Sequence, residues 1–258
     1  MLEVQEDLPN GAVLGAARAD LRDAIAGTSA FWLEGQEDRF TLGPEDAITG
    51  WNADARHAEP SEPNTGNGRL TRVGARVGLR CKAEVNCGLV VRGATENAAR
   101  FTMAVVYQPS DGAEARTLLT VNTGFGGGDA KTANYLFLSD GGAFLTVKDT
   151  RGAIEMTAPV VSGGSGPRML IVTLSGDQLA VAENLAPAVT VQGADPGMRC
   201  RGDLFIGCRS DRRGLKKTLG DSVVLDVMFW PDHTLLLPRC DADAALDLAL
   251  RRYFLWEY

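Results

Sequence analysis

A chain of 258 residues with 45% hydrophobic content is long enough to bury a sizeable core, and all-β chains of this length commonly fold as one domain. Its net charge of -7 argues against nucleic acid as a partner, because the molecule as a whole lacks the attraction to phosphate that drives such binding. No apolar run is long enough to span a bilayer, so membrane insertion is not expected.

The first 30 residues carry one helical pattern. Leu14, Leu21 and Ile25 lie at roughly helical spacing, and Gly27 provides a stop. We predict a short helix in an N-terminal segment, residues 1–30, that acts either as a brace for the following domain or as an attachment to a larger assembly. The beginning MLEVQEDLPN lacks the regions of a secretory signal, so we expect cytoplasmic synthesis without a signal peptide.

Turn-forming residues are frequent between Phe31 and Gly93, where Gly, Pro, Asn and Asp interrupt the apolar pattern. Short strands are predicted at 31–34, 75–79 and 88–91. The run HAEPSEPNTGNG is predicted to be an irregular loop, because its residues favour turns.

Beyond Arg100 the apolar residues alternate with the period of a β-strand. In FTMAVVYQP, the side chains of Phe101, Met103, Val105 and Tyr107 share one face. Further strands are predicted at RTLLTV, NYLFLSD, AFLTVKD, RMLIVTLS, QLAVAEN, DLFIGC and SVVLDVMFW. Because Gly-rich turns separate these strands and no helices intervene, we expect antiparallel sheets packed face to face.

The tail from Asp241 to Tyr258 returns to helical spacing, with Asp241 or Asp243 as a cap. We predict one short C-terminal helix, whose final aromatic residues, FLWEY, cover an open edge or side of the sandwich. No repeat or linker tract interrupts the chain, so residues 31–258 are predicted to form one domain.

Two regions resemble the concanavalin A-like lectin/glucanase superfamily, whose jelly rolls include laminin-G-like modules. The first is FWLEGQEDRFTLGPEDAITGWNADARHAEP, with Trp51, Asn52 and Asp54, and the second is DLFIGCR followed by Gly220 and VVLDVMFW. The resemblance implies an all-β fold, a two-sheet antiparallel jelly-roll sandwich with short N-terminal and C-terminal helices. It also implies recognition of saccharides, although such scaffolds carry lectins, lyases and glycosidases alike.

No predicted strand carries the carboxylate pair that glycosidases of this fold use. The pattern E-x-D-x-x-E does not occur, and Asp226 and Glu183 lie on separate strands, where Asp226 is expected to form a structural hydrogen bond. His57 and His233 lie in loop-like surroundings, which favours surface or turn roles over that of a lyase base. We therefore expect no enzyme activity and no catalytic residue, with a polysaccharide lyase or glycoside hydrolase as the alternative.

The segment NTGFGGGDAKTANY is predicted to be an inter-strand loop that contacts ligand. Its glycines do not lead from a strand into a helix, so it is not a nucleotide-binding loop. Asn122, Asp129 and Asn134 offer amides and a carboxylate for sugar hydroxyls, and Phe125 and Tyr135 offer rings that stack on a pyranose. These five residues form the predicted ligand-binding site.

No spacing specifies a metal site or a cofactor. Asp129, Asp140 and Asp149 lie near predicted turns, where calcium is sometimes bound in this fold, but ordinary Asx turns explain them as well. The five cysteines match no zinc site or disulfide framework and are expected to be buried thiols. A basic stretch from Arg199 to Lys217 reads as a solvated loop, with contact to an acidic polysaccharide left open.

The leading hypothesis is a non-catalytic, lectin-like carbohydrate-binding or adhesion protein. A glycan binder made without a signal could reach cell-surface polysaccharide as part of a virion or virion-like particle released by lysis. We therefore expect a spike, fibre or decoration subunit of a phage-like particle, repeated as a homo-oligomer and bound to other structural subunits. A purely structural assembly domain is the second alternative, and burial of Phe125 and Tyr135 against a neighbouring subunit would support it.

Overall fold

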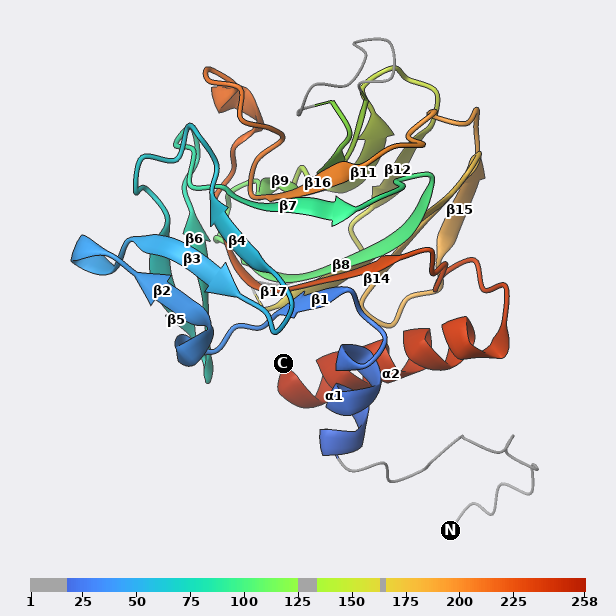
Figure 1. Cartoon of the computed structure of the whole chain (residues 1–258), viewed down its shortest axis with the longest axis horizontal. Coiled ribbons are helices and arrows are strands. Elements are labelled where there is room, and N and C mark those ends of the chain that lie inside the picture. Colours follow the sequence, from blue (N-terminus) through green and yellow to red (C-terminus); the bar gives the residue numbers. More distant parts are fainter. Residues whose placement is uncertain (1–17, 125–133, 163–165) are drawn as a thin grey trace.

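A computed structural model describes residues 18–124, 134–162 and 166–258. Two antiparallel β-sheets face each other, and helices α1 (Arg18–Ala26) and α2 (Asp241–Glu257) lie side by side below one of them (Figure 1). This arrangement confirms the predicted two-sheet sandwich with N-terminal and C-terminal helices. No helix within the described ranges is long and apolar enough to cross a membrane.

The sheet next to the helices has eight strands, with the long strands β8 and β17 paired near its centre. In spatial order the strands are β15 (Val189–Gln192), β14 (Gln178–Glu183), β13 (Arg168–Ser175), β8 (Arg100–Pro109), β17 (Ser222–Pro231), β6 (Arg76–Cys81) and β5 (Arg69–Val73), and β1 (Phe31–Leu33) pairs with β17.

The opposite sheet has nine strands. In spatial order these are β12 (Glu155–Pro159), β11 (Phe144–Asp149), β10 (Tyr135–Asp140), β9 (Arg116–Asn122), β16 (Gly202–Ile206), β7 (Leu89–Thr95), β4 (His57–Pro60), β3 (Ile48–Asn52) and β2 (Phe40–Leu42). The 3-10 turns are η1 (Glu37–Arg39), η2 (Pro44–Asp46) and η3 (Lys216–Thr218). The prediction of a loop over HAEPSEPNTGNG was wrong for its first four residues, which form β4 and pair with β7.

Alternation along β8 shows how the sequence separates two apolar layers. Phe101, Met103 and Val105 share one face, as predicted, and are fully buried between the sheets, while Ala104 and Val106 point the other way into a second cluster. That second cluster lies between the eight-stranded sheet and the two helices. Helix α1 contributes Ile25 to it, and α2 contributes four buried side chains, Leu246, Leu250, Tyr253 and Phe254. The helices therefore seal the outer face of this sheet.

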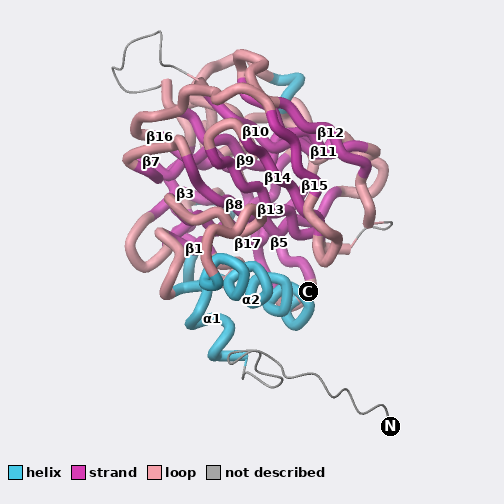
Figure 2. The backbone as a smooth tube through the Cα atoms, turned by 90° about the vertical axis from the view of Figure 1, so that its right-hand side faces the viewer, coloured by secondary structure: helices cyan, strands magenta, loops and turns pink. Residues whose placement is uncertain are grey.

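The outer face of the nine-stranded sheet is covered differently. Both helices lie on the far side of the molecule, as the side view shows (Figure 2). Residues 207–221, which connect β16 to β17, fold over part of this face, and a small apolar cluster forms there from Val90, Phe205, Cys208 and Leu219. Along β10 and β11 the outward side chains remain at least partly exposed at Tyr135, Ser139, Phe144, Thr146 and Lys148.

Candidate functional site

The structure brings together three of the five predicted ligand residues where β9 ends and β10 begins. Asn122 ends β9 and lies opposite Tyr135, the first residue of β10, and Asn134 immediately precedes Tyr135. Phe125 and Asp129 lie outside the described residues. Ligand binding by the five therefore stays a prediction.

The two asparagines use their amides inside the protein. The Asn134 side chain, 2% exposed, donates to Asp149 Oδ2 (3.1 Å) and to the Pro196 carbonyl (2.8 Å), and it accepts from the Thr150 amide (3.2 Å). The Asn122 side chain, also 2% exposed, donates to the Arg209 carbonyl at 3.2 Å. These amides position neighbouring segments, so Tyr135 is the half-buried member of the set that faces outward.

Arg209 completes this site and was not among the predicted residues. Its Nε donates to Thr117 Oγ1 (3.1 Å), and its guanidinium carbon lies 3.5 Å from the centre of the Phe137 ring, which is a cation–π contact. Because Asn122 holds the Arg209 carbonyl at the other end of β9, the arginine side chain runs along the outer face of that strand. The rings of Phe137 and Tyr135 are 6.1 Å apart, so the guanidinium adjoins an aromatic pair.

The charge of Arg209 is poorly compensated. Burial lowers its pKa, and Tyr135 offsets this only in part. Arg92, on the same face, has a raised pKa although burial opposes it, because its guanidinium binds Asp211 and Glu59. Among the residues that the structure describes, no carboxylate forms an ion pair with Arg209.

A buried hydroxyl lies in the same region. Thr120 is 0% exposed and lies opposite Phe137 on one side and Phe205 on the other, midway along the stretch of β9 that Arg209 follows. Within the described parts of the chain its Oγ1 has no hydrogen-bond partner, which is uncommon for a buried hydroxyl. This region thus combines two aromatic rings, a guanidinium with no carboxylate partner among the described residues and, beneath them, a buried hydroxyl.

Three carboxylates gather around Arg92 beside this site. Its guanidinium contacts Glu59 Oε1 (3.0 Å), Asp203 Oδ2 (3.2 Å) and Asp211 Oδ2 (2.7 Å). Asp203 lies opposite Asn122 across β16 and β9, so the cluster adjoins the Arg209 region. The sequence does not indicate this charged cluster, because its residues come from β4, β7, β16 and the connection that follows β16.

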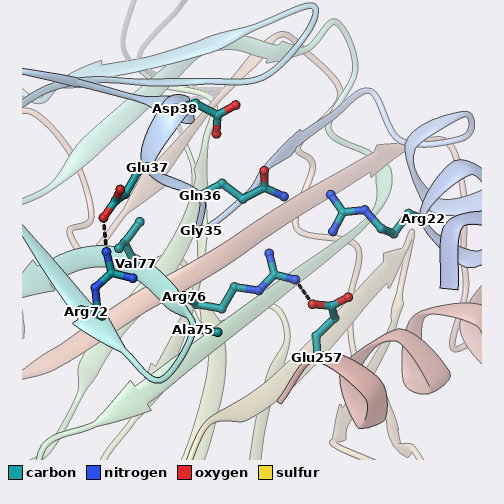
Figure 3. A pocket seen from close by; sticks show the side chains of 10 residues that line it. All are labelled: Arg22, Gly35, Gln36, Glu37, Asp38, Arg72, Ala75, Arg76, Val77 and Glu257. Atoms are coloured by element: carbon teal, nitrogen blue, oxygen red, sulfur yellow. Dashed lines mark hydrogen bonds and ion pairs between the residues drawn. The ribbon is translucent and has the colours of Figure 1, made fainter.

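A separate pocket of about 570 Å³ lies at the junction of both helices with the eight-stranded sheet (Figure 3). Arg22, Gln36 and Arg76 point toward one another across it, while Glu257 pairs with Arg76 and Glu37 pairs with Arg72 (Figure 3). These intramolecular ion pairs connect α2 and the β1–β2 segment to the β5–β6 hairpin. We interpret this pocket as structural.

Next to that pocket, Asp226 forms hydrogen bonds that hold the C-terminal residues in place. Its carboxylate accepts hydrogen bonds from the Gly35 amide (2.8 Å) and from the hydroxyls of Tyr253 (2.9 Å) and Tyr258 (2.7 Å). Burial raises the pKa of Asp226, and it also raises the pKa of Glu34. The expectation that Asp226 forms a structural hydrogen bond is confirmed.

Comparison with known proteins gives likeness in structure alone. No protein-family model matches the chain, and no curated protein matches its sequence. A Trypanosoma rangeli sialidase in complex with 2,3-difluorosialic acid matches with TM-score 0.53 and 17% identity over 88% of this chain and 33% of that chain. An arabinofuranosidase complexed with arabinofuranosyl-alpha-1,2-xylobiose matches with TM-score 0.50 and 10% identity over 79% of this chain and 51% of that chain.

The chain spans about a third of the length of that sialidase chain and about half of the arabinofuranosidase chain. At such low identities the likeness concerns the arrangement of the strands and not the activity of either enzyme. Together with the two antiparallel sheets and the flanking helices, it shows that this chain has the concanavalin A-like lectin/glucanase fold.

Proposed function

We propose that this protein binds carbohydrate without cleaving it, on the outer face of the nine-stranded sheet around Tyr135, Phe137 and Arg209. The observation that carries the proposal is the half-buried Tyr135 ring beside the Arg209 guanidinium, which itself lies on the buried Phe137 ring, on the sheet face opposite the helices. Aromatic rings stack on the apolar faces of sugar rings, and a small set of polar groups orients the hydroxyls. The fold is consistent with this use.

The carboxylates on this face favour binding over hydrolysis. Glycoside hydrolysis requires one carboxyl group to donate a proton and a second to act as base or nucleophile. Here Asp203 and Asp211 both engage Arg92, and each also accepts a backbone hydrogen bond, from Gly93 (2.7 Å) and Glu62 (2.9 Å). Their clustering on the proposed face is nevertheless the observation that favours a polysaccharide-cleaving enzyme as the second candidate.

The test is binding of the whole protein to an array of bacterial polysaccharides, with cleavage products assayed in the same samples. Tyr135→Ala should abolish saturable binding, because it removes a ring of the pair. Trp256→Ala is the matched control, since this 49% exposed aromatic lies on α2, on the other side of the molecule. Cleavage that is lost in Asp203→Asn would establish the enzyme instead, and neither binding nor cleavage would favour a structural assembly domain.

The finer proposal places the protein on the surface of a phage-like particle, where it would recognise cell-surface polysaccharide as a repeated subunit. The described chain begins at α1, which packs against α2 on the side opposite the proposed binding face. Attachment through the N-terminal side would therefore leave that face outward. Antibody labelling of particles released by lysis tests this proposal, and absence of the protein from such particles would contradict it.

A further inference from the structure

Arg209 gives the proposed face a specific chemical preference. A guanidinium removed from water is stable only when an anion or several acceptors compensate its charge. In the described chain Arg209 has the Thr117 hydroxyl, the Phe137 ring and Tyr135 beside it, and no carboxylate. Its planar fork of donors matches the two oxygens of a carboxylate.

Further positive charge lies on the same connection between β16 and β17. Arg212, Arg213, Lys216 and Lys217 are all exposed. A pocket of about 390 Å³ is lined by the first three of these, with Glu84 as the acidic residue in its lining. A chain with a net charge of -7 therefore concentrates cations on the segment that crosses the proposed binding face.

We infer that the ligand is an acidic saccharide, whose sugar carboxylate binds the Arg209 guanidinium beside the Tyr135 and Phe137 rings. The inference rests on the proposed function and names its ligand class. The carboxylate supplies the counter-charge that Arg209 lacks in the described chain, and the adjoining half-buried Tyr135 ring offers the sugar a surface on which to stack. The exposed cations strengthen the attraction of a polyanion from longer range.

The experiment compares polygalacturonate with the galactan obtained from it by carboxyl reduction, and alginate and hyaluronan with their reduced forms. Binding of the full-length protein is measured by isothermal titration at about 0.15 M salt, where exposed charges are largely screened beyond roughly 8 Å. Dextran sulfate serves as a polyanion without sugar carboxylates. We expect saturable binding to at least one uronate polymer, with its reduced form binding at least 10-fold more weakly, roughly the value of one charged hydrogen bond.

Substitutions test whether Arg209 is the residue that binds the sugar carboxylate. Arg209→Gln should weaken uronate binding by roughly 10-fold to 100-fold, whereas Arg212→Gln, which removes the same charge from an exposed position of the same connection, should weaken it by less than about 3-fold. Arg209→Lys keeps the charge but loses the fork and should fall between them. Thermal unfolding of each variant shows whether it folds, and the wild-type comparison of uronate and reduced polymers needs no variant.

The outcomes separate the two proposals. Equal binding to acidic and reduced polymers, or equal effects of Arg209→Gln and Arg212→Gln, would overturn the inference and leave carbohydrate binding standing. Binding to dextran sulfate as tight as to every uronate polymer would also overturn it, because general polyanion attraction would then suffice. Failure to bind any acidic, reduced or neutral polysaccharide would overturn the proposed function and the inference together.

Discussion

Asp226 is fully buried, and burial makes an ionised carboxylate costly. Three hydrogen-bond donors nevertheless stabilise it. Burial raises its pKa against the opposing effects of Tyr258 and Arg76. A group whose folded-state pKa lies above its unfolded value contributes most to stability below the unfolded pKa. That contribution is lost as pH rises through the folded pKa. Asp226 should therefore make the fold less stable at neutral than at mildly acidic pH.

Asp226→Asn provides the measurement. We expect the free energy of unfolding of the wild type, relative to this variant, to fall as pH rises from about 4 to about 8, because asparagine does not titrate. Urea unfolding at several pH values gives the difference, with Asp111→Asn, at an exposed position, as the control. A wild-type-minus-variant difference that stays constant over this range would show that burial does not raise the pKa of Asp226.

Asp140 and Asp149, two of the residues weighed for calcium, are already engaged within the protein. Asp140 accepts from the Tyr107 hydroxyl (2.6 Å) and the Gly142 amide (2.7 Å), and Asp149 accepts from the amides of Arg151 and Ile154 (both 2.9 Å). Because calcium needs six to eight oxygen ligands, we expect neither added calcium nor chelator to change the thermal unfolding midpoint. A calcium-dependent rise would direct attention to Asp129, outside the described residues.

At the residue scale, the sequence predicted which polar and aromatic side chains lie near the loop between β9 and β10. It did not predict their hydrogen-bond partners. Asn122 and Asn134 have the amides that sugar binding requires, and these bond instead to the Arg209 and Pro196 carbonyls, 87 and 62 residues away in sequence. The contact of Arg209 with Thr117 likewise spans 92 residues. Only the basic stretch from Arg199 to Lys217 pointed toward Arg209. Long-range pairing of this kind leaves no periodic pattern in the sequence.

At the element scale, prediction succeeded where a strand is long and packed on both faces. β8, β13 and β17 have alternating or continuous apolar side chains, because one face meets the core and the other meets the helices. The strands β2, β3, β5, β12 and β15 were missed, besides β4, which was predicted as loop. All are five residues or shorter and each has residues that are not buried, so none carries a continuous apolar pattern.

Helix α2 should contribute strongly to stability through its inward face. Leu250 is fully buried between the helix and the eight-stranded sheet, whereas Leu248 is 45% exposed on the same helix. Leu250→Ala should lower the free energy of unfolding by about 2–5 kcal/mol, through lost burial and the cavity left behind. Leu248→Ala should change it by less than about 0.5 kcal/mol. Guanidinium unfolding of both variants tests this, and equal effects would show that α2 does not pack as described.

At the scale of the whole molecule, the two outer faces of the sandwich differ in what covers them. The helices cover one face and enclose the apolar cluster around Trp230, while the other face presents Tyr135 and Arg209. The proposed ligand surface and the proposed attachment surface are therefore opposite faces of the sandwich. The sheet edges offer unpaired backbone groups through which copies can associate.

The four sheet edges differ in how they discourage pairing with another chain. β5 carries Arg69 and Arg72, β12 carries Glu155 and Pro159, and β2 is only three residues long. Charge, proline and shortness all discourage edge-to-edge pairing. β15 has the sequence VTVQ, without charge or proline, and Val189 at its start is 50% exposed. We therefore expect β15 to pair antiparallel with β15 of a second copy.

Sedimentation velocity over a range of protein concentrations tests this expectation. The wild type should reach roughly twice the 27.4 kDa mass of one chain, because two β15 edges supply each other's backbone partners. Thr190→Lys should shift the protein toward monomer, since pairing would bring the two lysines close together, whereas Thr71→Lys on β5 should leave the mass unchanged. A wild type that sediments as a monomer at about 0.1 mM would contradict self-association, since specific dimers commonly form at lower concentrations. A dimer that survives Thr190→Lys would mean that another surface joins the copies, and the proposed repeated subunit would then have to assemble through that surface.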